Sequence, residues 1–194
     1  GGYARRMLDA GITTVRDLGA PTPLAIELRE AARGGLVVAP DLLVAGAPVT
    51  ITGGHCWFMG GEADGVEGVR VAVRERHRAG VDWIKVMASG GNMTPGSDPT
   101  RAQFTFEEMR AIVDEAGRAG LRVTAHAHGV EGIRVAVEAG VHGLEHCSFQ
   151  TASGSVKDEA VIAQIAAQGT VVSPTIVGSL AAMEGTDRWR LRSE

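Results

Sequence analysis

Two histidines one residue apart end an apolar run of the chain. The segment RVTAHAHG covers residues 122–129, and on a β-strand the side chains of His126 and His128 would share one face. A third histidine, His146, ends the next apolar run. Imidazole is a common zinc ligand, so histidines that converge in this way predict a metal site. A lone histidine at a strand end is more often a hydrogen-bonded core residue, and the prediction therefore depends on the set.

Lys85 lies inside the apolar, strand-like run VDWIKVMAS. Both faces of a parallel sheet are buried, and a buried ammonium group is unfavourable unless it is paired or neutral. One interpretation pairs Lys85 with a carboxylate such as Asp17 or Glu145. The other is a neutral amine that takes up carbon dioxide, which gives a carbamate whose oxygens can bridge two metal ions.

A repeated pattern along the chain indicates the elements that position these residues. A helical segment ends in a small residue and a glycine, and a β-branched run follows at once. The glycines are Gly11, Gly80, Gly120, Gly140 and Gly169. Glycine suits the left-handed conformation that often follows a helix. Thr105 and Glu108 have the spacing of a capping box that opens a helix running to Ala119, and a further strand begins at Leu42.

Alternating helices and buried strands predict an α/β fold with a parallel sheet. Polar residues cluster at the carboxyl ends of the strands, which is the active face of a (β/α)8 TIM barrel. A doubly wound sheet is the alternative, but the glycine-rich segments match no phosphate-binding fingerprint. A complete barrel usually needs about 250 residues. The 194 residues therefore predict one domain, 1–194, that is an incomplete barrel with about strands two to seven, truncated at both ends.

Composition argues against several classes of function. The formal net charge is −4, and no basic run is long enough to indicate nucleic-acid binding. No signal peptide or membrane-spanning run is visible. The two cysteines, Cys56 and Cys147, make no disulfide framework. A cytoplasmic location is the default prediction, with no nucleic-acid or membrane partner, and a homo-oligomer is left open.

Together the motifs resemble the amidohydrolase superfamily of metal-dependent (β/α)8 hydrolases, and within it the imidazolonepropionase-like and Xaa-Pro dipeptidase-like branch. The matching segments are GITTVRDLG, ITGGH, IKVMASGG, AHAHG followed by EGI, GLEHCS and VVSPT. The resemblance implies that Lys85 is the carboxylated, catalytic lysine that bridges two metal ions. It also implies that His126 and His146 bind the more exposed ion. Ligands of imidazole nitrogen and carbamate oxygen favour zinc as the metal.

Three further residues are candidates for substrate contact. The resemblance assigns His55, in ITGGH, to substrate binding and His128 to the site wall, where a simple rim histidine is the alternative. Arg134 begins the helix after the His-x-His strand, and its guanidinium could clamp a terminal carboxylate; a solvated helix residue is the alternative. The implied reaction is hydrolysis of an amide or peptide C–N bond, in a dipeptide or N-acyl amino acid, by a hydroxide that bridges the two ions.

Two family features lack a match at the expected positions. These are the His-x-His pair of strand one and the Asp of strand eight, so the 194 residues alone are expected to carry half of a metal site and to be inactive. Other interpretations remain open. They are a cyclic amidase of the imidazolonepropionase type, a non-catalytic metal-binding remnant, and a barrel without metal in which Lys85 is salt-bridged. The expected partner is a small-molecule or dipeptide substrate.

Overall fold

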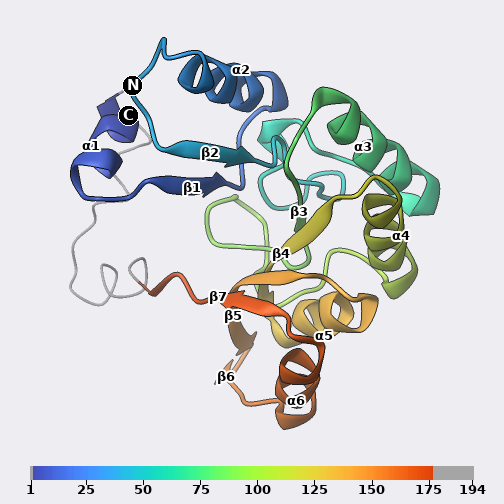
Figure 1. Cartoon of the computed structure of the whole chain (residues 1–194). Coiled ribbons are helices and arrows are strands. Elements are labelled where there is room, and N and C mark those ends of the chain that lie inside the picture. The colour runs from blue at the N-terminus through green and yellow to red at the C-terminus, as the bar shows by residue number, and fades with distance from the viewer. Residues whose placement is uncertain (1, 177–194) are drawn as a thin grey trace.

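Helices and strands alternate along the chain, as the sequence predicts (Figure 1). The structure is a computed structural model and describes residues 2–176. Its elements are α1 (Gly2–Asp9), β1 (Thr14–Asp17), α2 (Thr22–Arg33), β2 (Asp41–Val44), the 3-10 helix η1 (Trp57–Met59), α3 (Gly65–Ala79), β3 (Trp83–Met87), α4 (Phe106–Arg118), β4 (Arg122–Gly129), α5 (Val130–Ala139), β5 (Gly143–Thr151), β6 (Gly154–Ser155), α6 (Glu159–Gln168) and β7 (Val171–Ser173). Within the described residues, no helix is long and apolar enough to cross a membrane.

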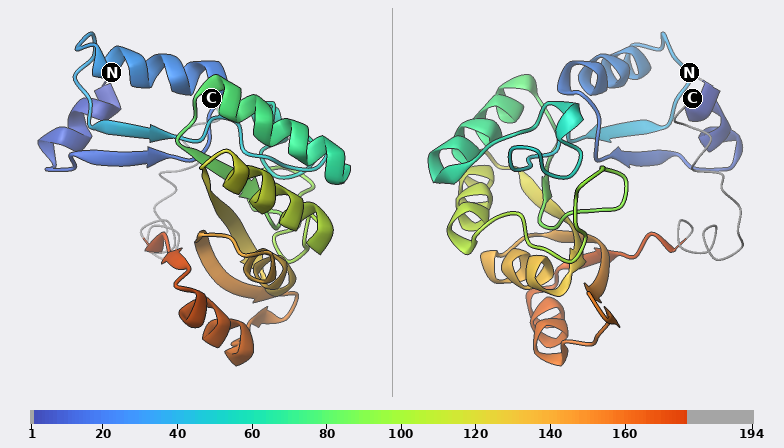
Figure 2. Two further views of the ribbon diagram at one scale, coloured as in Figure 1. Left: turned by 45° about the vertical axis from the view of Figure 1, so that its right-hand side comes forward. Right: turned by 180° about the vertical axis from the view of Figure 1, so that it is seen from behind.

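Six strands are parallel and follow one another in chain order. β1 pairs with β2, and β3, β4, β5 and β7 pair in that sequence. The two groups meet where the Asp82 N–H donates to the Val44 carbonyl (2.8 Å) and where Val49 bridges Val86. The views in Figure 2 show α3, α4 and α5 along the outer side of the curved strands. This is the arrangement of an incomplete (β/α) barrel and confirms the predicted fold class.

The core lies between the strands and the outer helices. Ile84 and Val86 of β3 are fully buried in one cluster with apolar residues of α3, α4 and α5. Because side chains alternate along a strand, Lys85 between them points to the concave side of the sheet. The register pairs Lys85 with Thr124 of β4, so these two residues lie side by side on that concave face.

Local signals at the helix ends agree with the sequence. All five glycines expected after helices have positive φ; they are Gly11, Gly80, Gly120, Gly140 and Gly169. The capping box also forms: the Thr105 hydroxyl accepts a hydrogen bond from the Glu108 N–H (3.3 Å), and the Thr105 N–H donates to the Glu108 carboxylate (2.9 Å). Helix α4 therefore begins where the sequence predicts.

Removing this cap is expected to destabilise the full-length protein modestly. Thr105→Ala should lower the free energy of unfolding by about 1 kcal/mol, because the Glu108 N–H loses its acceptor. Thr105→Ser keeps the acceptor oxygen and should stay close to wild type. Urea unfolding of the three proteins would measure the difference. Equal losses in both variants would contradict a capping role.

The end of β5 differs from expectation. On a regular strand Glu145 and His146 would face opposite sides of the sheet, but here both side chains lie on the same side. The Glu145 carboxylate accepts a hydrogen bond from the Thr124 hydroxyl (2.9 Å), while the His146 ring lies 4.7 Å from the His126 ring. The reason is the backbone: His146 and Cys147 have φ of 71° and 51°. Left-handed conformations of such residues each cost about 1–3 kcal/mol and concentrate at functional sites.

The sequence did not indicate the antiparallel hairpin that follows. β5 runs past the histidine to Thr151 and turns back into β6, with Gln150 opposite Ser155. The chain then enters α6, where the Asp158 carboxylate accepts a hydrogen bond from the Val161 N–H (3.2 Å). The hairpin is thus an excursion at the carboxyl end of β5, on the same side as the histidines.

Candidate metal centre

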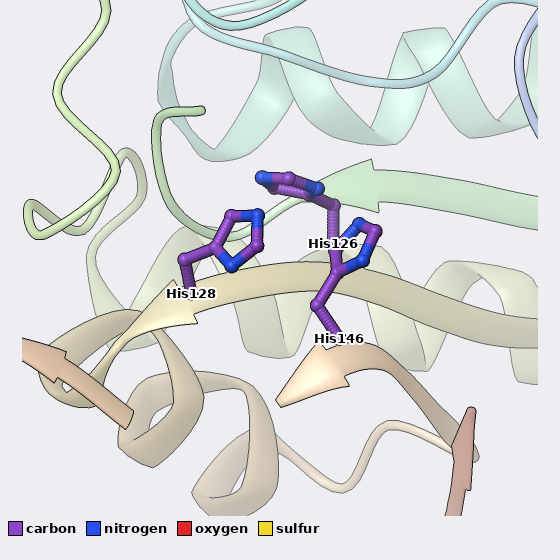
Figure 3. Close-up of side chains that lie close together, drawn as sticks. All are labelled: His126, His128 and His146. Atoms are coloured by element: carbon purple, nitrogen blue, oxygen red, sulfur yellow. The ribbon is translucent and has the colours of Figure 1, made fainter. Parts of the chain in front are cut away.

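Three histidines meet at the carboxyl ends of β4 and β5. Figure 3 shows the rings of His126, His128 and His146 turned toward one another. Ring centroids are 4.8 Å apart for His126 and His128, 4.7 Å for His126 and His146, and 4.5 Å for the stacked pair of His128 and His146. One ligand nitrogen from each lies within 4.8 Å of the others. The sequence placed His128 on the same face as His126 and predicted that His146 lies close to them, and the structure brings all three rings together.

The ring of His126 is oriented by the main chain. Its Nε2 lies 2.9 Å from the carbonyl oxygen of Gly90, which follows β3. A carbonyl only accepts hydrogen bonds, so Nε2 carries the proton and Nδ1 keeps a free lone pair. Burial, with a smaller contribution from Lys85, lowers the pKa of His126 far below its usual value. The side chain is therefore a neutral imidazole with Nδ1 available to a metal ion.

Hydroxyl groups orient the other two rings. His128 Nδ1 lies 2.6 Å from the Ser148 hydroxyl, and His146 Nδ1 lies 2.6 Å from the Thr175 hydroxyl. Nε2 is thus the nitrogen left for a ligand in both rings. Burial lowers the pKa of His128 and is the largest cause of a His146 pKa of about 4. A hydrogen bond on one nitrogen and a free lone pair on the other is typical of metal-binding histidines.

Lys85 is buried close to these rings without a carboxylate partner. In the described part of the chain its Nζ donates to the Met87 sulfur (3.8 Å) and takes part in no ion pair. Glu145, one candidate partner, is instead held by Arg16 (3.2 Å) and Thr124 (2.9 Å). Burial lowers the pKa of Lys85 from 10.5 to about 8, against an opposing effect of Glu145. With this lowered pKa, a larger fraction of the Lys85 amine is neutral near pH 7 than for an exposed lysine.

His55 lies beside the cluster, under the loop between β3 and α4. Its side chain is buried, its ring centroid is 4.6 Å from that of His126, and its Nδ1 is 3.0 Å from the Thr94 hydroxyl. Burial is the largest cause of a pKa of about 4, and Lys85 adds to it. Contact between His55 and a substrate remains a prediction. The structure places the His55 ring next to His126, a candidate metal ligand.

Arg134 lies on α5 and is half exposed. Its guanidinium donates to the Asp158 carboxylate (2.8 Å), which joins α5 to the start of α6. A substrate carboxylate would therefore compete with Asp158 for this side chain. Its predicted role as a carboxylate clamp is not tested by this arrangement.

Gln103, which no sequence pattern singles out, links the loops of the site by hydrogen bonds. Its side-chain oxygen accepts a hydrogen bond from the His55 N–H (2.6 Å), and its Nε2 donates to the Thr50 hydroxyl and the Met87 carbonyl (2.9 Å each). All three groups are buried or partly buried. A single amide inside a polar loop carries no periodic signal, so only the folded path of the loop identifies it.

A separate cavity of about 600 Å³ lies at the opposite ends of the strands. Residues that line it include Trp83, Arg122, His142 and Val171, at or next to the amino ends of β3, β4, β5 and β7. It is therefore distinct from the histidine cluster, which gathers at the carboxyl ends. The candidate site is identified by the ligand chemistry of the three histidines and not by the volume of a cavity.

Comparison with known proteins agrees with this geometry. The model of the amidohydrolase family matches residues 2–189. Ochratoxinase from Aspergillus niger is 38% identical over 167 residues, which are 73% of this chain and 34% of that protein. The chain thus spans about a third of the length of this relative.

Solved structures of Xaa-Pro dipeptidase and prolidase have the same architecture as this chain. A crystal structure of a Xaa-Pro dipeptidase with bound methionine is similar with a TM-score of 0.85 and 32% identity, over 94% of this chain and 47% of that one. A prolidase complexed with N-methylphosphonate-L-proline is similar with a TM-score of 0.80 and 36% identity, over 93% and 46% of the two chains. The chain spans about half of each. The family match over nearly its whole length places this chain in the amidohydrolase family.

Proposed function

We propose that the whole protein hydrolyses an amide or peptide C–N bond in a small substrate, a dipeptide or N-acyl amino acid. The proposed centre is zinc held by His126, His146 and a carboxylated Lys85. One observation carries the proposal: neutral imidazoles with one hydrogen-bonded and one free nitrogen converge next to a buried lysine that makes no ion pair with any described residue.

The donor set fits a divalent metal such as zinc. Zinc takes imidazole nitrogen and carboxylate oxygen at about 2.0–2.2 Å, and the free lone pairs here are Nδ1 of His126 and Nε2 of His146. His128 presents its own Nε2 within the same group, and we assign it to the site wall facing substrate. Lys85 supplies oxygen donors only after it reacts with carbon dioxide.

The residues of this chain prepare the centre in two ways. The neutral Lys85 amine attacks carbon dioxide, forms an N–C bond and loses one proton, which leaves a carbamate of carboxylate character. The Gly90 carbonyl and the Thr175 hydroxyl hold the rings of His126 and His146 in place. Bound divalent ions would lower the pKa of a water molecule and polarise the scissile carbonyl.

Two relatives support an amino-acid-derived substrate. The dipeptidase structure contains methionine, and the prolidase structure contains an N-substituted proline. Both ligands carry an α-carboxylate beside a nitrogen atom. We therefore expect the substrate to be an amide whose nitrogen or carbonyl belongs to an amino acid.

Metal removal tests the proposal. Full-length protein treated with a strong chelator should lose hydrolysis of dipeptides and N-acyl amino acids, because the water and carbonyl are no longer activated. Zinc with bicarbonate should restore it, and zinc in carbon-dioxide-free buffer should restore it less. Full activity in metal-free protein would contradict the zinc centre. Hydrolysis of cyclic amides alone would point instead to the imidazolonepropionase type.

A further inference from the structure

The loop between β3 and α4, residues 88–103, is held as a defined structure over His55. The Gly90 N–H donates to the Arg101 carbonyl (3.2 Å), and the Gly91 N–H donates to the Ser97 hydroxyl (3.1 Å). At its base Gln103 reaches across to the strand ends. A loop with these internal contacts can hold a side chain in a fixed position.

Thr94 on this loop bonds both His55 and the residue after it. Thr94 is 3% exposed; its hydroxyl accepts a hydrogen bond from the Cys56 N–H (2.9 Å) and lies 3.0 Å from His55 Nδ1. Cys56 has a φ of 58°, a turn that brings its N–H onto the hydroxyl. A hydroxyl has one proton and two lone pairs, so it can satisfy Nδ1 in either ring tautomer.

Gly91 on the same loop leaves the space that the His55 ring occupies. A Cβ atom at position 91 would lie 2.5 Å from both Cε1 and Nε2 of that ring, well inside van der Waals contact. His126 packs near the ring at a tilt of 34°. The ring is therefore confined by a hydroxyl, a bare backbone and a candidate metal ligand.

One atom of His55 remains without a partner in the described residues. Every fully buried side-chain nitrogen or oxygen there has a hydrogen-bond partner, and His55 Nε2 makes no hydrogen bond, so this atom is not fully buried although the residue is only 4% exposed. We infer that Thr94 is a positioning residue that holds His55 by Nδ1, so that Nε2 faces the substrate. The inference rests on the proposed function only in that His55 has a substrate to bind.

Thr94→Val in the full-length enzyme tests this inference, because valine keeps the shape and removes the hydroxyl. We expect KM for a dipeptide to rise about tenfold with kcat within about twofold, as for a contact made equally in the ground and transition states. Thr94→Ser should restore KM. Thr100→Val is the matched control, since its hydroxyl on the same loop donates to the Asp98 carboxylate (2.7 Å) instead.

A double-mutant cycle separates positioning from a general loss of structure. In a His55→Ala background, Thr94→Val should change KM no further, because the ring it positions is gone. An equal rise of KM in that background would overturn the inference. A parallel fall of kcat and bound metal, with no change in KM, would also overturn it.

A measurement that does not depend on catalysis distinguishes a failure of the proposed hydrolysis from a failure of the proposed role of Thr94. If the wild-type enzyme hydrolyses none of the substrates, the proposed function fails, and the positioning of His55 is decided by NMR. Nitrogen shifts of the His55 ring should change in Thr94→Val and stay unchanged in Thr100→Val. Identical ring signals in wild type and Thr94→Val would overturn the inference.

Discussion

Replacing Lys85 with methionine is expected to abolish hydrolysis and, in the metal-free full-length protein, to increase stability. Burial lowers the Lys85 pKa from 10.5 to about 8, which corresponds to a penalty of about 3 kcal/mol for the charged form. Methionine fills a similar volume without a charge. Urea unfolding at pH 7 should show the gain in stability. Metal analysis of zinc-treated protein should show a loss of bound metal, as the proposed role of Lys85 requires.

The sign of the pH dependence follows from the direction of this shift. Below about pH 8 the amine is charged in the folded and unfolded chains alike, so the folded wild type carries the full penalty. Between about 8 and 10.5 the unfolded chain binds more protons, and wild-type stability rises with pH. The advantage of Lys85→Met should shrink over that range. Lys157→Met, at an exposed position, is the control. A pH-independent difference, or a less stable Lys85→Met, would contradict the account.

Single alanine substitutions should divide the three clustered histidines into two classes. His126→Ala and His146→Ala should each weaken metal binding by about a hundredfold or more, because each removes a proposed ligand with an oriented lone pair. His128→Ala should retain the metal and raise KM. Metal content by elemental analysis and chelator competition would measure the first effect, and steady-state kinetics the second.

His77→Ala serves as the control for this comparison. His77 lies on the exposed side of α3, so its loss should change neither metal content nor KM. If His128→Ala lost the metal as completely as His126→Ala, His128 would be a ligand and its assignment to the site wall would be wrong. If none of the variants lost metal, the proposed centre itself would fail.

Local patterns in the sequence predicted the frame of the site well. The apolar run around Lys85 and the run before His126 form neighbouring parallel strands, with Met87 opposite His126 in the register. The spacing of small residue, glycine and β-branched run worked because glycine in the left-handed region is itself a local signal. Residue type and strand order were therefore enough to predict that the lysine and the histidines lie at one end of the sheet.

Such patterns could not predict the orientation of the side chains at the end of β5. His146 and Cys147 adopt positive φ, which is uncommon for any residue other than glycine and which strand periodicity does not indicate. Only packing in the folded protein holds that strained turn, so strand alternation misplaced His146 relative to Glu145. The contacts of Thr94 and Gln103 were missed for a related reason, since they depend on the path of a loop.

The hydrogen bond between His126 and Gly90 limits which substitutions can change the orientation of the His126 ring. Its acceptor belongs to the main chain, so no exchange of a side chain can delete it. Position 90 itself accepts only glycine, because a Cβ there would collide with the Asp98 carbonyl, whereas Asn92 and Met93 at the loop tip are exposed. The loop thus combines a position restricted by packing with exposed positions whose side chains can change without touching the His126–Gly90 hydrogen bond.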